Sequence, residues 1–390
     1  MRPRPSLLCA AAALSLAPAW MWRAAAQNPT AAQGATAIYL DRLDAAGGWL
    51  EGRREADQKP IRFKLTGSSR LVRFGTPGAL PEEFRPGDRL LVQSPAPKAN
   101  SREPVTALEI RDEITEQVRR GQSLVIEGQD AETYTFSVRD TRDGKVSKVE
   151  YGRGTFLVLR EDPRYVFRVS AGLEVFLNTA WPAGASQPIA REVLDGVTRE
   201  RFQKQQALRN LARAEVKGAE CDLIGKPTSV VNLQLRPQYA EWAATLKPGD
   251  SLQLEGAAAT PVTVQVGAVS GEQLRVTGAR PGFKPLGTLK LRPASPRHRY
   301  AEFIRPMLEV NCLSCHREGN AQSGYSMSNP ERMFMGSRRG VGVVPGKSSE
   351  SLLYLTMSGD RNPRMPTDRE PTSEQLALLR AWIDAGASVE

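Results

Sequence analysis

Cysteine and histidine are both scarce in this chain. Its 390 residues contain four cysteines and two histidines. Cys9 falls in the leader described below, and Cys312 and Cys315 belong to one motif, so Cys221 is left without a partner in the chain. We therefore expect no structural disulfide in the mature protein. We also expect Cys221 to be buried as a small apolar side chain.

Long apolar runs are missing as well. The most apolar stretch, Leu7–Ala17, follows Arg2 and Arg4 and precedes the small residues Ala24–Ala26, which is the order found in secretory signal peptides. It is shorter than the roughly 20 apolar residues that span a bilayer. We predict a signal peptide over residues 1–26, an exported protein and no transmembrane anchor.

The rarest residues meet near the C-terminus. Cys312, Cys315 and His316 form the pattern C-x-x-C-H, which attaches a haem through two thioethers and offers the adjacent imidazole to its iron. A zinc site would need about four nitrogen or sulfur ligands, and only Cys221 and His298 remain as distant candidates. A redox dithiol would need a βαβ context that the sequence does not show. We predict one covalently bound haem c, with His316 as an iron ligand.

A sixth iron ligand must come from elsewhere in the chain. Met365 lies in a polar stretch before the last predicted helix, and Pro366 biases it toward an extended conformation. His298 or an open position is the alternative. Three further methionines lie where they could simply fill gaps in a core: Met333, Met335 and Met357. We predict Met365 as the sixth ligand.

Two apolar stripes predict helices on either side of the motif. The first precedes Cys312 and contains Pro306, which should kink it or tighten its start. The second follows Thr372–Gln375, a capping box, and should pack Trp382 against Phe303. The stripes are Tyr300, Phe303, Ile304, Met307 and Leu308, then Leu376, Leu379, Trp382 and Ile383.

The region before this domain carries β signals. Ile61–Leu65 alternates apolar and polar residues, and Tyr134, Phe136 and Val138 alternate before an Asp-Gly turn. Further strands are expected at 90–92, 124–126, 156–159, 165–169, 173–177, 229–235, 262–266, 274–276 and 288–291. A Pro-Gly-Asp turn occurs twice before a strand, at 86–88 and 248–250.

These signals predict a multidomain fold class: a β-rich N-terminal region of small barrel or sandwich modules, followed by an all-α, class I-like cytochrome c domain. The predicted segments are a signal peptide (1–26), a β-rich domain (37–180), a helical connector (188–217), a second small β module (228–292) and the cytochrome c domain (299–390).

The positive charge lies before the predicted cytochrome domain. The formal net charge is +10, whereas the chain from Ala301 onward has 10 basic and 11 acidic residues. Part of the excess falls on the predicted helix Arg191–Lys217. The excess could serve an acidic partner or polymer, although a solvated surface explains it as well. We expect no binding of nucleic acid.

The C-terminal segments together resemble the planctomycete-type cytochrome c domain over about 90 residues. By that resemblance His316 and Met365 are the axial ligands, and the Pro345-Gly346 turn lies near the haem edge. Thr367 stands where the family usually has a second proline, which removes no ligand. The matching pieces are Phe303, Pro306, Leu308, Cys312–His316, Val344–Gly346, Ser351–Leu352, Met365–Pro366 and Trp382–Ala387.

The expected function is electron transfer in the periplasm or another extracytoplasmic space, with a redox protein as partner. His/Met ligation suits an iron that passes one electron. Arg338 and Arg339 are candidates for contacts to the haem propionates. His298 is the only spare imidazole, so peroxidase chemistry lacks an obvious acid or base. The alternatives are a haem-dependent oxidoreductase, a small-ligand sensor, or a β-rich binding module with an accessory haem domain.

Overall fold

The computed structural model describes residues 35–95, 104–152, 155–158, 169–280, 282–295, 297, 299–367 and 369–389. Within it, Ala35–Glu390 forms one compact unit. The predicted leader and His298 lie outside the described residues, as does most of the predicted strand 165–169. The domain boundaries given above stay predictions.

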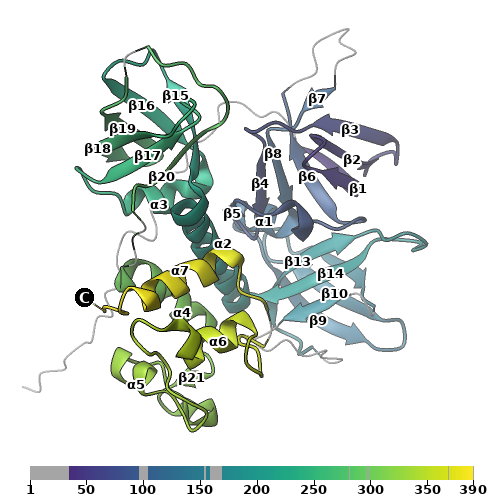
Figure 1. Cartoon of the computed structure of the whole chain (residues 1–390). Helices are drawn as coiled ribbons and strands as arrows, with labels where there is room; N and C mark the ends of the chain where they lie inside the picture. Colours follow the sequence, from purple (N-terminus) through teal and green to yellow (C-terminus); the bar gives the residue numbers. More distant parts are fainter. Residues whose placement is uncertain are drawn as a thin grey trace, which may run out of the picture. The chain divides into compact units, whose positions relative to one another are not determined.

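The first strands form an eight-stranded sheet in the order β5-β4-β8-β6-β1-β2-β3-β7 (Figure 1). The predicted strand at Ile61–Leu65 is present as β3, with Phe63 in the core. The elements are β1 (Thr36–Asp44), β2 (Trp49–Arg54), β3 (Pro60–Lys64), β4 (Arg70–Arg73), β5 (Thr76–Pro77), the 3₁₀ turn η2 (Pro81–Glu83), β6 (Arg89–Gln93), β7 (Val105–Thr106) and β8 (Glu109–Asp112).

A short helix leads into a six-stranded sheet with the order β11-β10-β9-β13-β14-β12. The predicted hairpin is confirmed, because β10 and β11 pair antiparallel and Phe136 and Val138 are buried. The elements are α1 (Glu113–Arg119), β9 (Leu124–Asp130), β10 (Thr135–Asp140), β11 (Val146–Glu150), β12 (Phe156–Val158), β13 (Glu174–Ala180) and β14 (Ile189–Asp195).

The longest helix, α2 (Gly196–Lys217), begins later than predicted. Arg191 belongs to β14, and the Asp195 side chain caps the helix by accepting from the backbone N of Thr198 at 2.8 Å. Some of its basic side chains contact other elements of the molecule. Arg209 forms an ion pair with Glu83, and Arg199 lies 4.8 Å from the centre of the Phe176 ring.

A closed six-stranded barrel follows α2, in the order β15-β16-β19-β18-β17-β20. Cys221 is 1% exposed in its core, which confirms the expectation for that residue. The elements are β15 (Ala219–Ile224), β16 (Val230–Leu235), η3 (Pro237–Tyr239), α3 (Ala240–Ala244), β17 (Ser251–Glu255), β18 (Val262–Ser270), β19 (Gln273–Thr277) and β20 (Leu289–Pro293).

The repeated Pro-Gly-Asp turn has the same construction in both places. The Asp88 carboxylate accepts from the backbone N of Arg85 at 2.8 Å, and the Asp250 carboxylate accepts from that of Lys247 at 2.9 Å. The intervening glycines have φ of +88° and +91°, which only glycine adopts without strain. Each turn leads directly into a strand, β6 or β17, as the sequence predicts.

The predicted fold class is wrong for the C-terminal region, which is not all-α (Figure 1). It contains short helical segments and a two-stranded sheet in which His316 and Arg317 pair with Asn320 and Ala321. Glycine and proline recur between the helices and limit their length. The segments are the π-helical turn η4 (Tyr300–Ile304), α4 (Arg305–Asn311), β21 (His316–Arg317), β22 (Asn320–Ala321), η5 (Gln322–Gly324), α5 (Pro330–Met335), η6 (Ser348–Glu350), α6 (Leu352–Ser358) and α7 (Ser373–Asp384).

The two predicted terminal helices are present with altered details. Pro306 lies in the first turn of α4, directly after the π-helical turn. Thr372 and Gln375 form the predicted capping box of α7. Trp382 packs on Tyr300 at a ring distance of 5.5 Å, whereas Phe303 faces Arg297.

Among the described residues, two ion pairs join α2 to the chain that follows the barrel. Lys217 pairs with Glu374 at the start of α7. Glu215, whose side chain is 0% exposed, accepts from Arg297 Nη2 at 2.8 Å and from Trp242 Nε1 at 2.9 Å. Arg297 also lies 5.5 Å from the centre of the Phe303 ring. These contacts hold the connection between β20 and η4 against the helix.

Candidate functional site

The C-x-x-C-H motif forms a tight turn at the end of α4. The carbonyl of Cys312 accepts from the backbone N of Cys315 at 3.1 Å and from that of His316 at 2.9 Å. Cys312 is buried and Cys315 is half-buried, and both are free thiols. The turn therefore holds both cysteines and the histidine on five consecutive residues of compact backbone.

The hydrogen bond of His316 fixes its tautomer. Nδ1 lies 2.9 Å from the backbone carbonyl oxygen of Tyr325, and a carbonyl can only accept. Nδ1 must therefore carry the proton and donate it, which leaves the lone pair on Nε2. Metal-bound histidines commonly have such a partner on their other nitrogen. The donor set thus fits a haem whose iron would bind Nε2.

Tyr325 connects the histidine to the next segment of the site. Its hydroxyl donates to the carbonyl of Met333 at 2.9 Å, and its burial raises the pKa of the phenol. At Gly342 an added Cβ would lie 1.9 Å from the Met333 carbonyl oxygen and 2.6 Å from the Tyr325 hydroxyl. The sequence gives no signal for Tyr325, because it is a single tyrosine outside any motif.

Residues 334–342 form a narrow hairpin beside this tyrosine. Ser337 and Gly340 exchange backbone hydrogen bonds of 3.0 and 3.1 Å, and Arg338 and Arg339 occupy the exposed tip. At Gly336 an added Cβ would lie 2.2 Å from the Gly340 carbonyl oxygen. The two arms therefore touch, and only glycine fits at this point.

Helix α6 holds both the hairpin and the Met365 segment. At its start, the backbone N of Leu352 and that of Leu353 each donate at 3.0 Å to hairpin carbonyls. Toward its end, the carbonyl of Thr356 accepts from the backbone N of Met365 at 2.9 Å. Met365 is half-buried. Its role as an iron ligand stays a prediction.

The rival methionines have different surroundings. Met333 and Met357 are 0% and 1% exposed in the core of this region, whereas Met335 is 66% exposed. Their positions suit packing for the first two and a surface role for the third.

The hairpin also contacts the Met365 segment through its arginines. The guanidinium of Arg339 donates to the carbonyl of Asn362, and Arg361 Nη2 donates to the carbonyl of Arg339 at 2.6 Å. The side chain of Arg338 is exposed. Contacts of Arg338 and Arg339 to haem propionates stay a prediction.

Arg369, which no sequence motif marks, acts electrostatically on Cys312. Burial is the largest cause that raises the pKa of the Cys312 thiol to about 12; the neighbouring Cys315 acts in the same direction and Arg369 acts against it. The charge of Arg369, four residues after Met365, therefore acts on the cysteine. The thiol is therefore protonated at neutral pH, unlike the low-pKa thiolates of redox-active cysteines.

No group of three or more His, Cys, Asp or Glu side chains is arranged to hold a metal ion in the described part of the chain.

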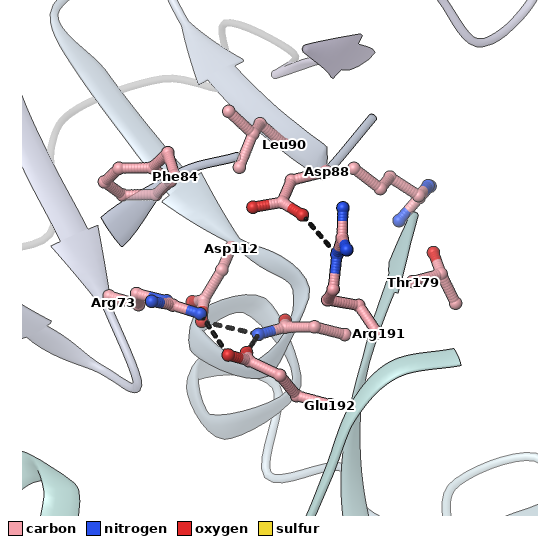
Figure 2. A pocket seen from close by; sticks show the side chains of 10 residues that line it. Arg73, Phe84, Asp88, Leu90, Asp112, Thr179, Arg191 and Glu192 are labelled. Atoms are coloured by element: carbon pink, nitrogen blue, oxygen red, sulfur yellow. Dashed lines mark hydrogen bonds and ion pairs between the residues drawn. The ribbon is translucent and has the colours of Figure 1, made fainter. Parts of the chain in front are cut away.

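A second polar cluster lies between the two large sheets (Figure 2). It surrounds a cavity of about 10 Å³, enough for at most one water. Figure 2 shows Asp88 and Arg191 facing each other. Arg191 Nε lies 2.9 Å from Asp88 Oδ1. Asn178 Nδ2 donates to Asp112 at 3.0 Å and to Glu192 at 2.7 Å.

The charges of this cluster are paired within it. Arg73 forms an ion pair with Glu192, and burial raises the pKa of Asp112 against the opposing effect of Arg73. We find no room for a substrate here. The cluster joins β4 and β8 to β13 and β14.

Comparison with known proteins bears on the haem motif. A family model described as Planctomycete cytochrome C matches residues 312–368. The predicted resemblance is confirmed. A cytochrome c segment implies binding of haem c and a c-type cytochrome-like role for this part of the chain.

Other comparisons add little. No curated protein matches the chain. One solved structure, drosophila Unr CSD456, matches with 8% identity over 68% of this chain and 99% of that one, and its TM-score of 0.16 supports no conclusion about the fold. None of the described helices is both long and apolar enough to cross a membrane.

Proposed function

We propose that the protein is an exported monohaem c-type cytochrome that transfers electrons. One haem c is attached through Cys312 and Cys315, with His316 and Met365 as axial ligands. The observation that carries the proposal is the hydrogen bond from His316 Nδ1 to the Tyr325 carbonyl, because it leaves the lone pair of Nε2 available to bind iron.

The protein's own residues have three tasks in this proposal. The motif turn holds the two thiols for attachment, Tyr325 orients the imidazole, and α6 holds the segment of Met365. The bound haem supplies a one-electron couple, whose potential His/Met ligation raises. The leader over residues 1–26 directs the chain to the periplasm or another extracytoplasmic space, where a redox protein is its partner. An acidic partner or polymer for the basic N-terminal region stays a separate prediction.

The test is an optical spectrum of the mature protein, oxidised and reduced. Met365→Ala should lose the weak far-red band of sulfur bound to ferric iron, and Met335→Ala, which changes an exposed methionine, should keep it. Denaturing extraction should leave the haem on the chain, and Cys312→Ala/Cys315→Ala should release it.

Two results would overturn the proposal in favour of other functions. A wild-type spectrum without the far-red band, together with rapid uptake of carbon monoxide by the ferrous protein, would favour an oxidoreductase or a small-ligand sensor. A protein that acquires no haem under conditions that mature other c-type cytochromes would leave the β-rich region as the working part.

A further inference from the structure

The exposed hairpin tip combines apolar and basic side chains. Met335 and Val341, on its two arms, are 66% and 52% exposed. Arg338 and Arg339 lie between them and Arg361 beside them, all exposed. We call these five residues the Arg338 patch. Large apolar side chains left exposed beside arginines are typical of protein interfaces, in which Met and Arg are enriched.

The positive charge of the Arg338 patch is not neutralised locally. Among the described residues, none of its three arginines forms an ion pair with a carboxylate. Arg339 and Arg361 donate to backbone carbonyls instead. Asp360, which directly precedes Arg361 in the sequence, accepts instead from the Ser358 hydroxyl at 2.7 Å. The chain from Ala301 onward has one more acidic than basic residue, so the patch is a local concentration of positive charge.

Direct contacts connect the Arg338 patch to the candidate haem site. Gly342, at the base of the hairpin, lies against the Met333 carbonyl and the hydroxyl of Tyr325, whose own carbonyl binds His316. On the other side, Arg339 contacts Asn362, three residues before Met365. A partner held at the patch would therefore lie next to the segments that carry both predicted iron ligands.

We propose that the Arg338 patch is the docking surface for an acidic redox protein. Its arginines attract the carboxylates of the partner, and Met335 and Val341 make the apolar contact. This inference rests on the proposed electron-transfer function. In the exchange, one electron leaves the reduced protein and the oxidised partner gains it; no bond forms or breaks and no proton moves.

The test measures oxidation of the ferrous holoprotein by two small reagents of opposite charge. Hexacyanoferrate(III) stands in for the acidic partner, and tris(phenanthroline)cobalt(III) is its cationic counterpart. At an ionic strength of about 10 mM, Arg338→Glu should slow the anionic reagent about tenfold and speed up the cationic one. Arg338→Gln should give about half of each effect on a logarithmic scale, and added salt should remove both.

The matched control is Arg142→Glu, which makes the same charge change at an exposed arginine between β10 and β11. It should leave both rates within about twofold of the wild type. The far-red band and the urea midpoint of each variant verify that the Met365 segment and the fold are intact.

The outcomes separate this inference from the proposed function. If the wild type exchanges electrons with both reagents and Arg338→Glu changes neither rate, the docking surface is refuted and the cytochrome stands. A midpoint potential that shifts while the ratio of the two rates stays constant would assign Arg338 to a propionate instead. A holoprotein that exchanges electrons with neither reagent would refute the proposed function itself.

Discussion

Arg297→Met should be strongly destabilising, because it removes the cation that is paired with a fully buried carboxylate. The side chain of Glu215 is 0% exposed, and Arg297 contacts it through Nε at 3.2 Å and Nη2 at 2.8 Å. After the substitution, the donors to the carboxylate that remain among the described residues are Trp242 Nε1 and the backbone N of residue 297, each at 2.9 Å. Methionine keeps an apolar stem against Phe303, so the loss is mainly electrostatic.

The expected loss of unfolding free energy follows from the burial of this ion pair. Removing one partner of a buried ion pair costs about 3–5 kcal/mol. We expect the low end, about 3 kcal/mol, because two donors remain. Urea unfolding followed by tryptophan fluorescence measures it, as a lower midpoint with an unchanged slope.

Two further variants make the result interpretable. Arg292→Met breaks a surface pair with Glu255, whose side chain is 31% exposed, and should cost less than about 1 kcal/mol. Adding Glu215→Gln to Arg297→Met should recover part of the loss, because it removes the unpaired charge. A loss for Arg297→Met no larger than that for Arg292→Met would refute the reasoning.

Two other predictions test the site and its connection to α2. Gly342→Ala should cost about 2–3 kcal/mol in urea unfolding and weaken the far-red band, because its Cβ would overlap the Met333 carbonyl. The control is Gly128→Ala, whose Cβ would have nothing within 4 Å and which should do neither. Burial opposes ionisation of Glu374, but its hydrogen bond from Lys217 and the charge of that lysine lower its pKa to about 2. A carboxyl whose pKa is lowered in the folded state stabilises the protein at pH values above its ordinary pKa of about 4.3. Lys217→Gln should therefore cost about 1 kcal/mol of unfolding free energy at pH 7, discounted for solvent screening. That difference should vanish as the pH falls from about 4 to 2; a difference that persists at pH 2 would contradict the assignment.

The sequence predicted correctly those features that depend on residues close together in the chain. The capping box at Thr372, the hairpin at Phe136 and the two Pro-Gly-Asp turns all depend on residues close together in the chain. The haem motif belongs to the same class, since its five residues are contiguous.

Contacts between distant segments gave no such signal. Nothing near Tyr325 in the sequence indicates that its carbonyl binds His316, and Glu215 and Arg297 are 82 residues apart. The all-α prediction failed for a related reason: the apolar stripes located helices correctly, but the segments between them were assigned by analogy. Those segments contain the β21–β22 pair, which forms around Gly319 at a φ of +81°.

The hairpin that carries the Arg338 patch should tolerate substitutions at its tip but not at its base. Gly336 and Gly342 tolerate no side chain, because their neighbours would lie 1.9–2.2 Å from an added Cβ, whereas Arg338 and Arg339 at the tip are exposed. Substitutions at the tip can change which molecule is recognised. They leave the hydrogen bond of His316 in place, because the glycines at the base of the hairpin stay the same. Under the docking proposal, substitutions at Arg338 and Arg339 would change the partner that is recognised while the hydrogen bond between His316 and Tyr325 is kept.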